Sequence, residues 1–208
     1  WDIGDALFGT VTHYGDVAGG TSYSSNLTAV LPGVTPGNYH VIVRSDIRNH
    51  IPESNENNNI GGSLDSVALD VEALTMGVAD TGELGSGQSI YYKFDVAAGE
   101  TVRLSLDSAG DNNANEIYVR YGSMPTPGQF DVAAREGFES DPQLLIPTTQ
   151  AGTYYVLAYG RAVSGGTAYS IKAEIIPFSV TDVHAKEIGN SGDVTLRIDG
   201  ARFAADTV

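Results

Sequence analysis

Two neighbouring stretches, Ile90-Tyr91-Tyr92-Lys93-Phe94-Asp95-Val96 and Thr101-Val102-Arg103-Leu104-Ser105-Leu106, alternate apolar and polar side chains. In the first, Ile90, Tyr92, Phe94 and Val96 share one face, while Tyr91, Lys93 and Asp95 share the other. The turn Ala98-Gly99 separates the two stretches. A period of two is typical of β-strands that bury one face. Both stretches therefore predict strands that pack on a core.

The same alternation recurs in residues 38–44, 66–71, 116–121, 153–159 and 168–175, with glycine-rich or asparagine-rich turns between several of them. No stretch of ten or more residues has a helical 3.6-residue stripe, and residues 133–138 are the one candidate for a short helical turn. Strands about 8–12 residues apart with turn signals between them favour sandwiches. We expect an all-β fold of tandem antiparallel β-sandwiches.

The composition excludes several classes of protein. The chain has 208 residues, and its 26 acidic and 11 basic residues give a formal net charge of −15, which argues against a nucleic-acid partner. No run approaches 18 apolar residues, so we expect no membrane insertion. Cysteine is absent, which rules out disulfides, zinc-thiolate sites and a cysteine nucleophile.

The domain organisation follows from changes in composition along the chain. We divide the chain into residues 1–76, 77–176 and 177–208, and interpret the small, glycine-rich segment 77–87 as a linker or as a gradual entry into a second unit. Residues 195–200 alternate like a strand shortly before the last residue. We therefore expect neighbouring domains in a longer parent chain.

The first segment resembles the C-terminal part of a CARDB domain, a bacterial adhesion-related immunoglobulin-like module. That family ends with a G-x-Y-x-V strand, a D-x-x-N loop and an E-x-x-E-x-N-N run. The matching elements begin at Gly37, Asp46 and Glu53, in that order. The resemblance covers roughly residues 1–75 without the usual first strands, and it implies a partial Ig-like sandwich.

The second segment resembles a bacterial pre-peptidase C-terminal (PPC) domain, which implies a jelly-roll-like sandwich. The resemblance rests on Tyr92-Lys93-Phe94, Ala98-Gly99-Glu100-Thr101-Val102, Tyr118-Val119-Arg120-Tyr121-Gly122, Pro125-Thr126, Ala151-Gly152-Thr153-Tyr154-Tyr155-Val156 and Gly166-Thr167-Ala168-Tyr169-Ser170. Asn113 and Asn115 depart from the D-A-D run that is frequent in the family. The tail, with Asn190-Ser191-Gly192-Asp193 and Ile198-Asp199-Gly200-Ala201-Arg202-Phe203, is similar to the start of a TIG domain.

These resemblances imply a secreted or cell-surface bacterial protein and modules that are not themselves enzymes. The four histidines lie outside any H-E-x-x-H motif, and there is no G-x-S-x-G elbow. We therefore expect a non-catalytic adhesion, spacer and binding segment. One alternative is a carbohydrate-binding module accessory to a polysaccharide-degrading enzyme, and another is a fragment of a hydrolase.

Calcium is the one cofactor that the sequence suggests, because two runs concentrate the oxygen ligands that calcium prefers. Neither run has EF-hand spacing, and hydrogen-bonded turns explain the same residues. The candidate ligands are Asp46, Glu53 and Glu56 in the first run, with Asn49, Asn55 and Asn58, and Asp107, Asp111, Asn113 and Glu116 in the second, with Asn115.

Exposed aromatic rings on a sheet face would suit a polysaccharide or another extracellular polymer. The alternation predicts that Tyr91 points outward with Lys93 and Asp95, that Tyr118 shares a face with Arg120, and that Tyr155 shares one with Tyr159. The alternative is that these tyrosines pack at the edges of the sandwich, with their hydroxyls exposed to water. The sequence therefore offers Tyr91, Tyr118, Tyr155 and Tyr159 as a candidate platform.

Overall fold

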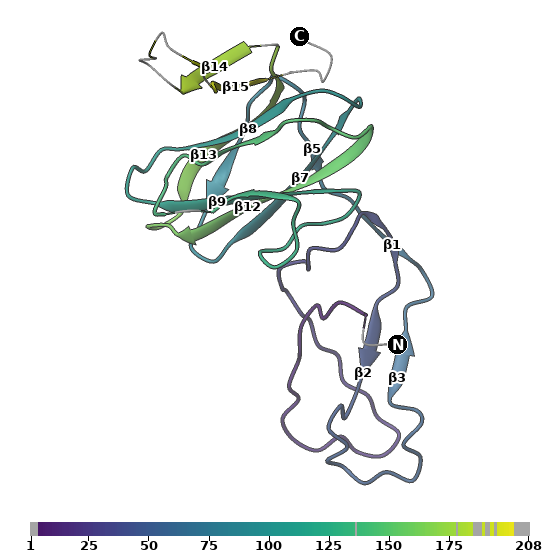
Figure 1. Ribbon diagram of the computed structural model, residues 1–208. Coiled ribbons are helices and arrows are strands. Elements are labelled where there is room, and N and C mark those ends of the chain that lie inside the picture. Colours follow the sequence, from purple (N-terminus) through teal and green to yellow (C-terminus); the bar gives the residue numbers. More distant parts are fainter. Residues whose placement is uncertain are drawn as a thin grey trace. The chain divides into compact units, whose positions relative to one another are not determined.

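A computed structural model describes residues 4–135, 137–177, 179–184, 189, 192–193 and 195–201. Within these residues every regular element is a β-strand, as the alternation predicts (Figure 1). No helix among them has the length and apolar character needed to cross a membrane. The all-β class is therefore confirmed.

The chain divides into two compact units, Trp1–Asp70 and Val71–Val208. The first unit holds two antiparallel ribbons, in which β1 (Gly37–Tyr39) pairs with β4 (Val67–Leu69) and β2 (Ile42–Arg44) pairs with β3 (Ile60–Gly62). The alternating run 38–44 is thus split, since the Val41 amide donates to Ser63 Oγ at 3.0 Å. No described residue of this unit is buried.

The second unit contains a sandwich of two sheets (Figure 1). One sheet has five strands in the order β10-β9-β12-β7-β5, and the other has four in the order β11-β8-β13-β6. All pairs are antiparallel except β5 with β7. The strands are β5 (Glu72–Ala73), β6 (Asp80–Leu84), β7 (Ser89–Val96), β8 (Val102–Ser108), β9 (Ala114–Tyr121), β10 (Val132–Ala134), β11 (Gln143–Ile146), β12 (Gly152–Ala162) and β13 (Thr167–Ile175).

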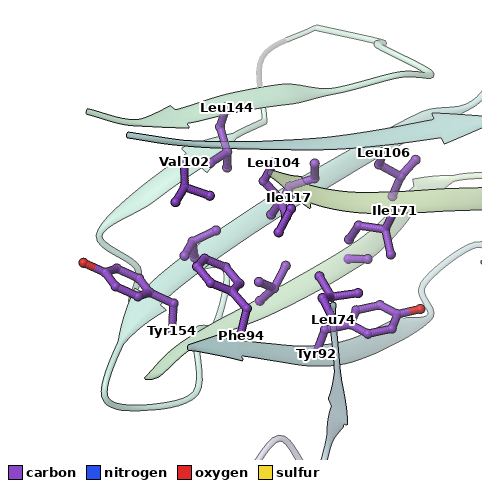
Figure 2. Packing of buried hydrophobic residues seen from close by; sticks show 14 of the residues in the cluster. Leu74, Tyr92, Phe94, Val102, Leu104, Leu106, Ile117, Leu144, Tyr154 and Ile171 are labelled. Carbon is purple, nitrogen blue, oxygen red and sulfur yellow. The ribbon is translucent and has the colours of Figure 1, made fainter. Parts of the chain in front are cut away.

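The core lies between these two sheets. Figure 2 shows Leu104 and Ile171 from the four-stranded sheet pointing toward Phe94 and Tyr92 from the five-stranded sheet. Phe94 stacks on Tyr154 with ring centroids 5.4 Å apart. Apolar burial of this kind is the main favourable term in folding, and it requires the period-two pattern seen in the sequence.

The structure decides two local interpretations. The glycine-rich segment 77–87 is part of the second unit rather than a linker throughout, because β6 pairs with β13 and Leu84 is only 1% exposed. Glycine at position 82 leaves room for the Tyr169 ring, since a Cβ at this position would lie 3.0 Å from that ring. Residues 132–134 form strand β10 beside β9, so the first two residues of the candidate helical turn 133–138 are extended instead. A short edge strand carries too few residues to show its period.

The boundaries of the expected domains differ from those of the compact units. The units divide between Asp70 and Val71, because β5 already pairs with β7 and Leu74 lies in the sandwich core. At the other end, β14 (Ser179–His184) pairs with β15 (Arg197–Ala201). Asn190, Ser191, Arg202 and Phe203 lie outside the described residues, so the TIG-like start stays a prediction.

Strand β11 gives a direct test of the alternation. Leu144 is buried in the core, and its neighbour Leu145 is 44% exposed on the outer face. We predict that Leu144→Ala lowers the free energy of unfolding by about 2–5 kcal/mol. Leu145→Ala should lower it by less than about 1 kcal/mol. Urea unfolding followed by near-ultraviolet circular dichroism measures both, and equal losses would contradict the register of β11.

Candidate functional site

The two outer faces of the sandwich differ in chemistry. The outer face of the four-stranded sheet carries mainly small polar and charged side chains, namely Thr81, Glu83, Arg103, Ser105, Asp107, Ser170, Lys172 and Glu174. All four tyrosines of the predicted platform lie on the outer face of the five-stranded sheet, since their strand neighbours face the core. We call this surface the tyrosine face.

The register of the strands sets the layout of the tyrosine face. Leu157 of β12 lies opposite Tyr91 of β7 and Tyr118 of β9. Leu157 points away from the core and yet has an exposed fraction of 0%. Directly opposite side chains on one face are close enough to contact. Neighbouring side chains therefore cover Leu157 completely.

Charged residues lie in the next row of the same face. Tyr155 of β12 lies opposite Lys93 of β7 and Arg120 of β9. Tyr91, Tyr155 and Tyr159 are all half-buried, so each ring keeps some accessible surface. Burial also raises the pKa of Tyr91. The face thus offers partly exposed rings beside cationic side chains.

Tyr118 corrects the prediction of four exposed rings, because its exposed fraction is only 2%. The segment after β9 folds back over it. The Asp131 amide donates to the Val119 carbonyl at 2.8 Å, and the Phe130 ring lies 5.3 Å from the Tyr118 ring. The Arg135 guanidinium lies 4.8 Å from the Phe130 centroid. This segment therefore covers Tyr118, and the Tyr118 ring cannot contact a ligand.

A buried carboxylate anchors Tyr118 in place. The Tyr118 hydroxyl donates to Glu116 Oε2, and Arg161 Nη1 donates to Glu116 Oε1 at 3.2 Å. Burial, followed by the hydrogen bond to Glu116, raises the pKa of Tyr118 to about 12. Glu116 thus joins Tyr118 and Arg161 in a polar network at the end of the tyrosine face. The sequence did not predict this role of Glu116.

The first acidic run forms a hydrogen-bonded loop in the first unit. Asp46 accepts bonds from the His50 and Ile51 amides at 2.9 Å, and these bonds lower the pKa of Asp46. Glu56 Oε1 accepts a bond from the Glu53 amide at 2.8 Å. Asp46 and Glu56 line one polar cavity of about 230 Å³, and Glu53 is not among its lining residues. Much of the oxygen set is thus engaged in holding the loop.

The second acidic run is spread over different surfaces. Asp107 and Asp111 are exposed, whereas Asn113 is buried and bonds to Ser108 Oγ at 3.1 Å and to the Ser164 amide at 3.2 Å. Glu116 belongs to the tyrosine face. The described residues contain no group of three or more acidic or histidine side chains that could hold a metal ion. Calcium binding at either run stays a prediction.

Two family models match the chain. Residues 88–160 match the bacterial pre-peptidase C-terminal domain, and residues 6–62 match CARDB. The central part of the chain is thus similar to a PPC domain. The PPC match spans β7, β9 and most of β12, so the tyrosine face lies within the matched residues. Both resemblances read from the sequence are confirmed, and both matched families are accessory modules.

Individual relatives extend the comparison. Alkaline serine exoprotease A of Vibrio alginolyticus is 32% identical over 96 residues, which are 46% of this chain and 17% of the exoprotease. The pre-peptidase C-terminal domain of Bacillus anthracis collagenase gives a TM-score of 0.41 at 13% identity, over 50% of this chain and 94% of that one. The g-type lysozyme inhibitor PliG of Aeromonas hydrophila gives 0.35 at 14% identity, over 50% and 99%.

The Tyr118–Glu116 bond makes a second testable prediction. Tyr118→Phe removes a donor and leaves a buried carboxylate oxygen unpaired, so it should lower the free energy of unfolding by about 1–3 kcal/mol. Because folding raises the pKa of Tyr118 from 10.0 to about 12, the stability that this shift adds is complete below pH 10. It should disappear between pH 10 and pH 12.

The control for this prediction is Tyr155→Phe on the same face. Tyr155 is half-buried, and its substitution should change the free energy of unfolding by less than about 0.5 kcal/mol. Urea unfolding at neutral pH and in steps above pH 10 measures both variants. A Tyr118→Phe variant as stable as the native chain would contradict the network.

Proposed function

We propose that this chain is an accessory binding and spacer segment of a secreted or cell-surface bacterial protein, and that its tyrosine face binds an extended extracellular polymer, with a polysaccharide as the favoured class. The observation that carries this proposal is the asymmetry of the PPC sandwich. Three half-buried tyrosines surround a buried leucine on one outer face, while the opposite outer face is mainly polar, with Leu145 as an exposed apolar side chain.

The chemistry of tyrosine supports this function. A tyrosine ring offers a flat apolar surface and a polar hydroxyl, and its two χ angles lose little entropy on binding. Sugar rings present C–H faces that can stack on such surfaces, while their hydroxyls need polar partners. Tyr155 and its neighbours Lys93 and Arg120 provide both kinds of contact.

The parent protein is part of the proposal. A relative named as a serine exoprotease supports a secreted hydrolase as the protein to which this segment belongs. In that setting the first unit serves as a spacer, and the PPC domain holds the enzyme near a polymer. An adhesion protein with the same segment is the second candidate, supported by the CARDB match.

Affinity electrophoresis through gels that contain a soluble polysaccharide tests the proposal. The probes are hydroxyethyl cellulose, carboxymethyl cellulose and cellulose sulfate. We predict that at least one of them retards the chain. Tyr91→Ala, Tyr155→Ala and Tyr159→Ala should each weaken that retardation about tenfold, which is the scale of a central aromatic contact.

The matched control is Tyr14→Ala in the first unit, where the native ring is 87% exposed. This variant should migrate like the native chain. Absence of retardation by all three polymers would overturn the proposed function. Retardation that the three platform variants leave unchanged would place binding elsewhere on the chain.

A further inference from the structure

We propose that the tyrosine face binds an internal stretch of an extended, cellulose-like polysaccharide chain that lies along strand β12. This inference rests on the proposed function and specifies the shape, the direction and the length of the ligand. It starts from the order of the outward tyrosines. Tyr155 and Tyr159 lie on β12, and Tyr91 lies on β7 opposite Leu157, which is midway between them. We call these three tyrosines the tyrosine row.

A covered strand beside the tyrosine row sets the direction of the ligand. The Phe130 ring lies 5.3 Å from the Tyr118 ring, and Arg120 Nη1 donates to Gln129 Oε1 at 3.3 Å. The segment that carries Gln129 and Phe130 therefore lies over the outward side of β9. The tyrosine row belongs to the next two strands, β12 and β7. A polymer that crossed the strands would meet this segment, whereas a polymer parallel to β12 would not.

The spacing of the tyrosine row sets the length of the ligand. Four residues of an antiparallel strand rise about 13 Å, a distance that about three consecutive sugar rings of an extended chain cover. The outer two sugar rings then lie at Tyr155 and Tyr159, and the middle ring lies beside Tyr91. A disaccharide covers only part of this distance, so we expect affinity to rise with chain length until the row is filled.

The straight course of the row favours a cellulose-like chain. Equatorial bonds join the glucose rings of cellulose, so the chain is extended, and each ring has axial C–H bonds on both faces. Tyrosine rings offer flat apolar surfaces to such C–H faces and hydroxyl groups to their polar edges. An amylose-like chain has axial linkages and coils, so its successive rings cannot follow a straight strand.

Exposed polar groups lie beyond both ends of the tyrosine row. Past Tyr155, the exposed Asp95 accepts a bond from Thr153 Oγ1 at 2.5 Å. Past Tyr159, the Arg161 side chain is 53% exposed and lies 3.2 Å from Glu116 Oε1. These groups are polar partners for the hydroxyls of a chain that continues past the tyrosines. The row therefore suits an internal stretch of a polymer rather than its end.

Isothermal titration calorimetry of the full 208-residue chain with defined oligosaccharides tests this inference. The probes are cellobiose, cellotetraose, cellohexaose and the amylose-like maltohexaose. We expect cellotetraose and cellohexaose to bind with similar affinity, and cellobiose and maltohexaose to bind about tenfold more weakly or worse. Borohydride reduction of the end of cellohexaose should leave its affinity unchanged, because the end lies outside the tyrosine row.

Variants connect the length dependence to the tyrosine row. Tyr155→Ala and Tyr159→Ala each remove one end of the row, so each should weaken cellohexaose binding about tenfold, toward the affinity of cellobiose for the native chain. The matched control is Leu145→Ala, which removes an exposed apolar side chain from the opposite outer face and should keep the length dependence. Circular dichroism verifies that each variant is folded.

Several outcomes would overturn this inference and leave the proposed function intact. These are equal affinity for cellobiose and cellohexaose, equal affinity for maltohexaose and cellohexaose, and loss of affinity when the end of cellohexaose is reduced. Retardation by a substituted cellulose without any binding of cellohexaose would assign recognition to the substituents and have the same meaning. Failure of cellohexaose and of all three polymers would overturn the inference and the proposed function together.

Discussion

The register of strand β12 between β7 and β9 is the constraint on which the sandwich and its tyrosine face both depend. Val156 and Leu157 are adjacent, point to opposite sides of the sheet, and both have an exposed fraction of 0%. A slip of one residue would exchange the core face for the outer face along the whole strand. Gly160 helps to pin this register, since a Cβ there would lie 2.3 Å from the Gly85 carbonyl oxygen.

That register has a direct chemical consequence. Because the core takes the even-numbered positions of β12, tyrosines at positions 155 and 159 are left on the outside. Tyr155 lies opposite Lys93 and Arg120, and Tyr159 lies opposite Ser89 and Glu116. The opposite outer face shows what a merely solvated surface of this sandwich looks like, with a compensated Arg103–Glu174 pair and no tyrosine among its outward strand positions. The partly exposed rings of Tyr91, Tyr155 and Tyr159 thus lie together on one outer face of the sandwich.

The sequence predicted the parts of this arrangement that depend on local alternation. The strands at residues 90–96, 102–106 and 116–121, and the outward direction of Tyr91, follow from a period of two. The burial of Tyr118 and Leu157 could not be predicted, because their cover comes from the register of other strands and from the loop that carries Phe130. The acidic runs show the same limit: composition suggested metal ligands, whereas the folded chain uses Asp46 and Asn113 to hold turns.

Hydroxyl-radical footprinting of the native chain tests most directly whether the tyrosine face is the ligand surface. Mass spectrometry would report the oxidation of individual tyrosines with and without carboxymethyl cellulose, the carboxylated probe. The account predicts that the polymer protects Tyr91, Tyr155 and Tyr159 and leaves the exposed Tyr14 unchanged. Protection of Tyr14 with none at the three platform tyrosines would contradict it.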